Sequence, residues 1–186
     1  FSDSDELLRE HTTNFELWRN TNGIHITNGE SSPNNRIKNQ ANLAVDTWYH
    51  VTLTNNNGSF KVYWNGLESN TDNDVTGTTH TIGTVTSWTL AGRGDSNDEP
   101  HNGLLNQVLM YDDVLTDAEV LTLYGGGSGT KTPSTSNLVT HYDFQETSGT
   151  TLTDRVGSNN GSLSGTADLT NDGVFATGTT SDLPEN

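Results

Sequence analysis

Six Asn-Gly pairs are the feature of this sequence that most narrows its possible folds. They stand at residues 22–23, 28–29, 57–58, 65–66, 102–103 and 160–161. Both residue types tolerate the positive φ that the tight turns of β-hairpins require. Several pairs separate runs in which apolar and polar residues alternate, which is the pattern of a half-buried strand. The sequence therefore predicts antiparallel strands joined by short turns.

The clearest predicted hairpin surrounds the turn at Asn57 and Gly58. Its strands are TWYHVTLT (47–54) and SFKVYWN (59–65). Because side chains alternate between the two faces of a strand, three apolar residues of each strand share one face. They are Tyr49, Val51 and Leu53 on the first strand, and Phe60, Val62 and Trp64 on the second. We expect this face to line the core.

The remaining pattern is also that of a β protein. Further strands are predicted at 15–20, 24–27, 88–93, 104–111 and 138–144. One segment has helix signals, because Thr116 and Glu119 form a capping box ahead of an apolar run. The pattern predicts an antiparallel sandwich or barrel with one short helix near 116–124.

Composition limits the partners of the chain. Its formal net charge is −16 over 186 residues. Such acidity disfavours binding to nucleic-acid phosphates and to anionic membranes. No apolar run approaches the length that spans a bilayer, and the absence of Cys excludes disulfides and thiolate zinc sites. We therefore expect no nucleic-acid partner and no membrane insertion.

Several segments together resemble the laminin-G-like family of concanavalin A-type jelly rolls. The late features of that family match Trp48–Val51, Tyr63–Gly66, Leu90–Arg93, Gly103–Tyr111 and Leu115–Tyr124, and its opening matches Leu138–Gly165. The resemblance implies an all-β, antiparallel jelly-roll β-sandwich. At Asn106 and Gln107 the sequence departs from the family, which often has two carboxylates there.

The segment that resembles the N-terminal part of the family comes after the segments that resemble its C-terminal part in this chain. We expect residues 1–125 to form a jelly-roll body, 126–136 a Gly/Ser/Thr linker, and 137–186 the front strands that complete the same or a neighbouring sandwich. An unpaired front strand would leave sheet edges and half a core exposed. Leu138, Thr140, Tyr142 and Phe144 are predicted to face this core. Whether the pairing is within one chain or between chains stays open.

The loop at 92–100 is the densest group of oxygen donors. Asp95, Asn97, Asp98 and Glu99 could supply part of a calcium site, since calcium takes six to eight oxygen ligands, and the resemblance implies calcium at a sheet rim. The alternative is a solvated acidic turn. Elsewhere, we expect Asp154, Asn159 and Asn160 to cap turns rather than to bind ions.

A sugar-binding surface is predicted beside the same loop. Trp88, with Arg93 and His101 nearby, could stack on the apolar face of a pyranose, and the alternative for Trp88 is plain packing. His50 and His141 are expected to point outward from their strands.

The sequence predicts binding rather than catalysis. A retaining glycan hydrolase needs two carboxyl groups about 5–5.5 Å apart, and no predicted strand has acidic residues at alternate positions. We expect a non-enzymatic, extracellular binding or adhesion module, whose ligand is a glycan, on a cell surface or a virion fibre such as that of a phage. The alternative is an assembly subunit, either a homo-oligomer or part of a repeat array, whose copies donate strands to one another.

Overall fold

The antiparallel strands predicted above are present in the computed structural model. It describes residues 5–10, 15–20, 23–27, 36–40, 44, 47–57, 59–69, 87–92, 101, 104–129 and 133–164. The chain divides into two compact units. The first is made of Phe1–Trp64 and Glu68–Gly103, and the second of Asn65–Leu67 and Leu104–Asn186.

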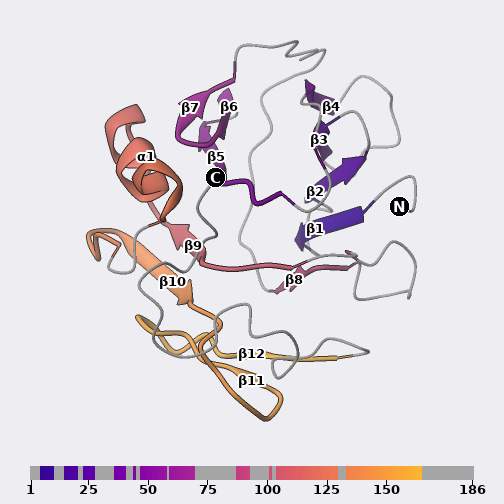
Figure 1. The fold of residues 1–186 in the computed structure, drawn as a ribbon, viewed down its shortest axis with the longest axis vertical. Helices are drawn as coiled ribbons and strands as arrows, with labels where there is room; N and C mark the ends of the chain where they lie inside the picture. Colours follow the sequence, from indigo (N-terminus) through magenta and orange to yellow (C-terminus); the bar gives the residue numbers. More distant parts are fainter. Residues whose placement is uncertain are drawn as a thin grey trace. The chain divides into compact units, whose positions relative to one another are not determined.

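A five-stranded antiparallel sheet forms most of the first unit (Figure 1). Its strands run in the order β4-β3-β2-β1-β8. Their bounds are Asp5–Glu10 for β1, Phe15–Asn20 for β2, Gly23–Thr27 for β3, Arg36–Gln40 for β4 and Trp88–Leu90 for β8. The β2–β3 ladder extends to the pair Asn20 and Gly23, so the hairpin predicted at the first Asn-Gly pair is confirmed.

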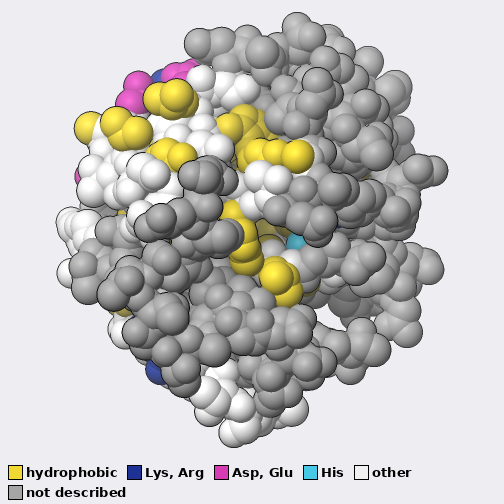
Figure 2. Space-filling model, viewed as in Figure 1, with side chains coloured by type: hydrophobic (Ala, Val, Ile, Leu, Met, Phe, Trp, Pro, Cys, Tyr) yellow, Lys and Arg dark blue, Asp and Glu magenta, His cyan; other side chains and the backbone are white. Residues whose placement is uncertain are grey.

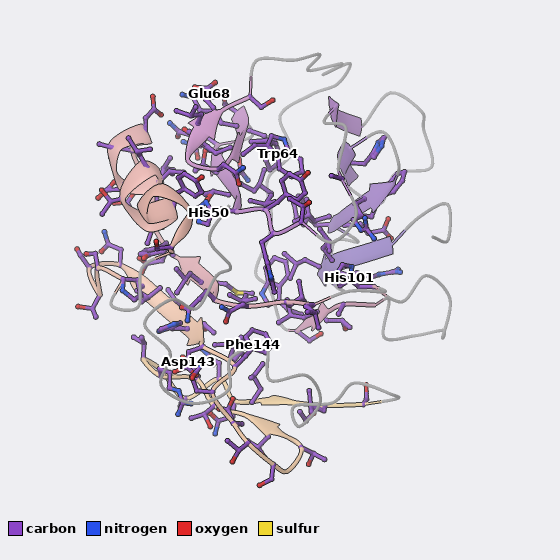
Figure 3. All side chains as sticks on the ribbon, viewed as in Figure 1. His50, Trp64, Glu68, His101, Asp143 and Phe144 are labelled. Atoms are coloured by element: carbon purple, nitrogen blue, oxygen red, sulfur yellow. The ribbon has the colours of Figure 1, made fainter. Side chains whose placement is uncertain are left out.

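The predicted central hairpin is also confirmed. Strands β5 (Val51–Asn56) and β6 (Ser59–Trp64) pair antiparallel, with Val51 opposite Trp64 and Leu53 opposite Val62. A short third strand, β7 (Leu67–Glu68), continues the sheet beside β6. Tyr49 lies edge-to-face on Trp64, which Figure 3 labels, with ring centroids 5.8 Å apart. The shared apolar face of the two strands is therefore the one that sequence alternation predicts.

Phe15 joins the two sheets of the first unit into a sandwich. Phe15 of β2 and Val62 of β6 form the centre of the apolar cluster, with 1% and 3% of their surface exposed. The Phe15 ring stacks on Phe60 at 6.1 Å. The partly buried residues that pack around this centre are Leu17, Leu53, Phe60, Trp64 and Trp88. Burying a large apolar side chain stabilises a fold by about 1.5–3 kcal/mol, so this cluster holds the sheets together.

The second unit contains the helix and the strands on either side of it. Strand β9 (Val108–Tyr111) precedes helix α1 (Asp117–Tyr124) and the 3-10 turn η1 (Gly125–Gly127). Strands β10 (Leu138–Tyr142), β11 (Thr151–Leu152) and β12 (Gly161–Ser162) follow. β10 pairs antiparallel with β9, and β11 with β12. The fold-class prediction, antiparallel β structure with one short helix, is confirmed.

The predicted capping box begins the helix. Glu119 N donates to Thr116 Oγ1 at 3.3 Å, and Thr116 N donates to Glu119 Oε2 at 2.7 Å. The helix ends at Gly125, whose left-handed conformation lets its N–H donate to Leu121 O. Local sequence signals are thus sufficient to fix both ends of α1.

One glycine lets the turn after β6 lie directly on the helix. A Cβ at Gly66 would come within 3.0 Å of Leu121 Cδ1 and of Tyr124 Cβ, and φ at Gly66 is +81°. No other residue type combines that backbone conformation with so close an approach. The Asn65–Leu67 turn is therefore part of the second unit.

The connection between α1 and β10 is partly tied to β9. Tyr111 Oη donates to Ser134 O at 3.3 Å, and Asp112 N donates to Asn137 O at 2.9 Å. Pro133 is buried. The described end of the predicted linker thus lies along the end of β9, while the domain boundaries proposed from sequence stay predictions.

Some apolar side chains of the second unit are at the surface. Among the residues that the structure describes, those with 40% or more of their surface exposed are Leu67, Leu104, Val114, Leu121, Val139 and Val156. Figure 2 shows hydrophobic side chains, in yellow, on the face that it displays. Scattered exposed apolar residues are ordinary in soluble domains, and we assign them no role.

Candidate functional site

The loop that sequence analysis singled out is closed at its base. His101 N donates to Ala91 O at 3.1 Å, and Ala91 N donates to Leu7 O at 3.0 Å. These bonds join the two ends of residues 92–100, which we call the rim loop, and attach them to β1. Ala91 has a positive φ of 61°, which turns the chain out of β8 at this point. Figure 3 labels His101, at the far end of the rim loop.

Two of the predicted ligand residues, Trp88 and His101, lie in the described part of the chain that flanks this loop. Trp88 is half-buried, and its ring contacts Phe15 edge-to-face at 6.5 Å. Packing therefore accounts for one side of Trp88. His101 is half-buried as well. Arg93 and the predicted calcium ligands Asp95, Asn97, Asp98 and Glu99 lie outside the described residues, so those assignments stay predictions. Within the described ranges, no cluster of three or more His, Asp or Glu side chains could hold a metal ion.

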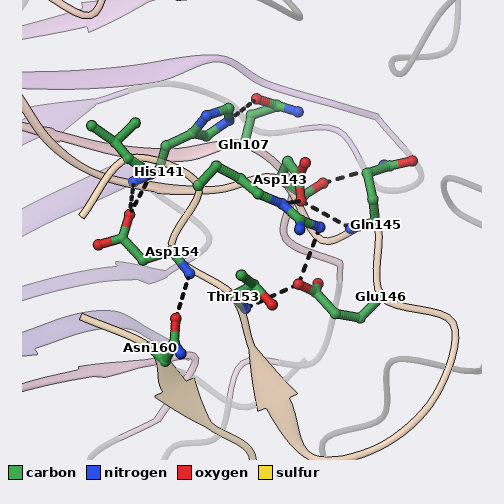
Figure 4. A network of polar contacts seen from close by, with 10 residues as sticks. Gln107, His141, Asp143, Gln145, Glu146, Thr153, Asp154 and Asn160 are labelled. Atoms are coloured by element: carbon green, nitrogen blue, oxygen red, sulfur yellow. Dashed lines mark hydrogen bonds and ion pairs between the residues drawn. The ribbon is translucent and has the colours of Figure 1, made fainter. Parts of the chain in front are cut away.

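A second polar site surrounds the buried carboxylate of Asp154 (Figure 4). Asp154 Oδ1 accepts the N–H of His141 at 3.0 Å and of Val156 at 3.1 Å. Its Oδ2 accepts the N–H of Asn159 at 3.1 Å. The prediction that Asp154 orders a turn is confirmed. We call residues 154–160 the Asp154 loop.

Backbone donors keep Asp154 ionised. Burial alone would raise the pKa of Asp154, but hydrogen bonds from the N–H groups of His141, Gly157, Val156 and Asn159 bring the pKa below its ordinary value. A carboxylate offers about four lone-pair sites, and four N–H groups occupy them here. Asp154 is therefore an anion held by the backbone, with no lone pair to offer a cation.

The Asp154 loop also covers the outer edge of β10. His141 N donates to Asp154, and His141 O accepts Arg155 N at 2.8 Å. Both backbone groups of His141 are thus paired on the side away from β9. An unpaired strand edge invites pairing with other chains, so the loop closes this edge at its middle.

Side chains add further bonds between the Asp154 loop and β10. Asp154 N donates to Asn160 Oδ1 at 2.9 Å, and Asn159 Nδ2 donates to Thr140 Oγ1 at 3.2 Å. Tyr142 Oη donates to Asn159 O. These bonds give Asn159 and Asn160 the turn-capping role that sequence analysis predicted.

Arg155 lies between two carboxylates of the segment that follows β10. Its Nε bonds Asp143 Oδ1 at 2.9 Å, and a terminal guanidinium nitrogen bonds Glu146 Oε1 at 3.2 Å. The same Glu146 oxygen accepts Thr153 N at 2.9 Å. Arg155 thus supplies the positive charge that two neighbouring carboxylates require. Both carboxylates are ion-paired with Arg155, each through one oxygen.

The outward orientation predicted for His141 is wrong. A β-bulge between Leu138 and Thr140 shifts the alternation of β10. As a result Thr140 and His141 are both buried, with 4% and 7% exposed, while Val139 is exposed. Burial lowers the pKa of His141. The negative charges of Asp143 and Asp154 act to raise this pKa, and the positive charge of Arg155 acts to lower it. His50 is half-buried, and burial lowers its pKa too.

Gln107 explains how a buried imidazole is accommodated. Its Oε1 lies 2.8 Å from His141 Nε2. A neutral amide is a suitable partner for a neutral ring, whereas the carboxylate that the family often has in this region would favour the charged ring.

Leu138 and Thr140 are buried as predicted, but Tyr142 and Phe144 are only half-buried. Phe144 has φ of 54°, so the strand has ended before it.

Local sequence rules do not predict Arg155 as a charge partner, and they indicate Gly157 as a steric requirement only weakly. A Cβ at Gly157 would lie 2.7 Å from Asp154 Oδ2 and 2.9 Å from Val139 O. Real Cβ atoms do not approach so closely, so this position needs glycine for the loop to reach β10. A glycine three residues after an acidic residue is the only local signal, and it is a weak one.

Comparison with known proteins identifies the fold. The family model described as the concanavalin A-like lectin/glucanases superfamily, Laminin_G_3, matches residues 2–121. The chain belongs to this superfamily. The family resemblance proposed from the sequence motifs is thereby confirmed. A search of curated protein sequences finds no match.

Two solved structures are similar to this member of the superfamily. One is a protein from Bacteroides ovatus described as a "putative carbohydrate binding protein", with 17% identity and a TM-score of 0.64. The match covers 87% of this chain and 48% of that chain, so the present chain spans about half of its length. The other is an S-layer domain-containing protein from Clostridium thermocellum, with 18% identity, a TM-score of 0.32, and coverage of 64% and 63%. The first similarity supports the fold.

None of the helices that the structure describes is long and apolar enough to cross a membrane.

Replacing Asp154 with Asn should destabilise the fold by about 2–3 kcal/mol, because an amide cannot accept the same set of charge-assisted hydrogen bonds. The pKa of Asp154 is lower in the folded state than in the unfolded state. Its contribution to the free energy of unfolding is therefore present above about pH 4 and is lost as the pH falls through the folded-state pKa. Urea unfolding at pH 7 and at pH 3 measures this difference. Asp112→Asn, at an exposed position, should change little at either pH. An equal effect of the two variants at pH 7 would contradict the role of Asp154.

Gly157→Ala should destabilise by about 1–3 kcal/mol, since the added methyl group overlaps Asp154 and the backbone of Val139. Gly161→Ala is the matched control, because a Cβ there meets Leu152 only at ordinary contact distance, 3.5 Å. Thermal unfolding of both variants compares them directly. If Gly157→Ala were as stable as Gly161→Ala, the close approach described here would be wrong.

Proposed function

We propose that this chain is a non-enzymatic binding module that recognises a glycan outside the cell, on a cell surface or a virion. Its fold is that of a superfamily named for lectins and glucanases. The similar Bacteroides ovatus protein is described as a putative carbohydrate binding protein. These two findings support a carbohydrate as the ligand class.

The arrangement of carboxylates favours binding over hydrolysis. Retaining hydrolysis needs two carboxyl groups about 5–5.5 Å apart, which alternate positions on a strand would provide. No strand in the described ranges has carboxylates at alternate positions. Asp143 and Glu146 do lie together, but both are bonded to Arg155. We therefore propose a ligand-binding role without catalysis.

The observation that carries the location of the site is the bond between His101 N and Ala91 O. It joins Ala91 and His101, the residues that flank the rim loop, and Ala91 is bonded in turn to Leu7 of β1. Trp88 is on β8, three residues before Ala91, His101 follows the rim loop, and Arg93 is in the loop between them. Loops on a rigid scaffold commonly carry binding residues. We propose Trp88, Arg93 and His101 as the sugar contacts.

The rim loop is also the proposed calcium site. Asp95, Asn97, Asp98 and Glu99 offer side-chain oxygens within five consecutive residues. Oxygen ligands of this kind suit a hard cation such as calcium.

Glycan binding should depend on the rim loop. Substituting Arg93 and His101 together by Ala should weaken binding about tenfold or more, which corresponds to about 1.4 kcal/mol. The test is a glycan array followed by titration of the glycans retained. Trp88 is left unchanged because its ring also packs on Phe15. Ser59→Ala, exposed at the far hairpin, should bind normally. Equal binding by both variants, or no glycan retained by the parent, would contradict the proposal.

Calcium should raise the melting temperature. A ligand at a hundred times its Kd stabilises the folded state by about 2.7 kcal/mol, and chelator should reverse the shift. Asp98→Asn should reduce the calcium-dependent shift, whereas Asp72→Asn, in a different acidic segment, should not. Identical melting curves with calcium and with chelator would remove calcium from the proposal.

A further inference from the structure

The strand that pairs with β9 comes from outside the part of the chain that matches the superfamily. That match ends at residue 121, within α1. The pairing strand β10 begins at Leu138, after residues 125–136. Leu138 is opposite Tyr111, His141 opposite Leu109 and Tyr142 opposite Val108. The last strand of the matched region thus depends on a strand that is connected to it only through a linker.

The segment that supplies this strand is held together by its own bonds. The carboxylate of Asp154 bonds His141, Val156 and Asn159, and Arg155 bonds Asp143 and Glu146. Leu163 N donates to Thr150 O, which closes the β11–β12 end. All these partners lie between residues 138 and 163. We call residues 137–163 the front segment.

The contacts that we find between the front segment and the preceding chain converge on β9 and its ends. They are the ladder with β9, the Gln107–His141 bond, and the bonds of Asn137 to Asp112 and Asp113. None of these contacts requires that the two partners belong to one chain. A second copy would offer the same β9 with the same groups.

The linker allows either arrangement. Gly125, Gly126, Gly127 and Gly129 all have positive φ, a conformation that glycine can exchange for others at little steric cost. The twelve residues 125–136 can span at most roughly 40 Å when fully extended. This length can lead back to β9 of the same chain or across to β9 of a neighbour.

We propose that the front segment is exchanged between copies of this chain, with β10 of one copy pairing with β9 of another. The exchanged contacts are the same as those within one chain, so the two forms differ mainly in linker entropy. A short flexible linker gives an effective concentration in the millimolar range. Pairing within the chain is therefore favoured in dilute solution, and exchange rises as the concentration of copies approaches that range, as in a dense surface layer.

Engineered cysteines can detect the exchange, because the chain has no Cys of its own. Leu109 and His141 are directly opposite, and the backbone groups of His141 bond the Asp154 loop instead of β9. This is therefore a non-hydrogen-bonded pair, about 4.5 Å between Cα atoms, within the range that a disulfide bridges. The full chain is made as Leu109→Cys, as His141→Cys and as the double variant.

The double variant should form a disulfide within one chain, which tests the pairing of β9 with β10. The two single variants are then mixed, unfolded, refolded together at about 10 μM or about 1 mM, and oxidised. Exchange predicts a covalent dimer of twice the 20.1 kDa chain mass, joined between positions 109 and 141. We expect at least about tenfold more of it at the higher concentration.

The matched control mixes Leu109→Cys with Val139→Cys, since Val139 lies on the same strand but is exposed. A 109–141 dimer that never exceeds the yield of this control would overturn the exchange. A double variant that fails to close its own disulfide would overturn the pairing on which the exchange rests. Neither result bears on glycan binding, so this test and that of the proposed function fail independently.

Discussion

The second unit depends on one buried carboxylate. Asp154 lies at the outer edge of β10 and collects backbone N–H groups from that strand and from its own loop. Burying an unpaired charge would cost several kcal/mol, so the side chain is stable only where these donors converge. The donors in turn converge only because Gly157 lets the loop lie close to Val139 O. The position of the loop, the buried charge of Asp154 and the glycine at position 157 therefore depend on one another, and together they act as one constraint.

This constraint explains the unusual side chains of β10. The bulge between Leu138 and Thr140 turns His141 inward, and burial lowers its pKa, which favours the neutral ring. Gln107 on the approach to β9 then provides a neutral partner. Charged groups remain at the margin, where Arg155 bonds Asp143 and Glu146. The network thus has two parts. The Gln107–His141 pair is inside, and the ion pairs of Arg155 are partly open to solvent.

Sequence reasoning succeeded where the controlling interactions are local. The β5–β6 hairpin follows from alternation around Asn57 and Gly58, and α1 from a cap that spans four residues. The orientation of His141 was missed because a bulge inverts the alternation without a residue that signals it. The roles of Gln107 and Gly157 depend on segments that are distant in sequence or on a loop path that local rules do not give. For Trp88, the sequence left packing and ligand contact open, and the Phe15 contact accounts for one face only.

The blocked edge of β10 also limits what an exchanged front segment can do. With His141 N and O both bonded to the Asp154 loop, the segment has only one side from which to pair at that position, and β9 occupies it. Two copies that exchange segments reciprocally satisfy both β9 strands and form a closed, two-fold dimer. Non-reciprocal exchange would instead extend from copy to copy, because each chain offers one front segment and one β9. Both outcomes use the same linker and the same β9–β10 contacts, so they differ in whether the exchange closes on itself. A strand edge that is open on both sides would add lateral aggregation, and the Asp154 loop opposes that.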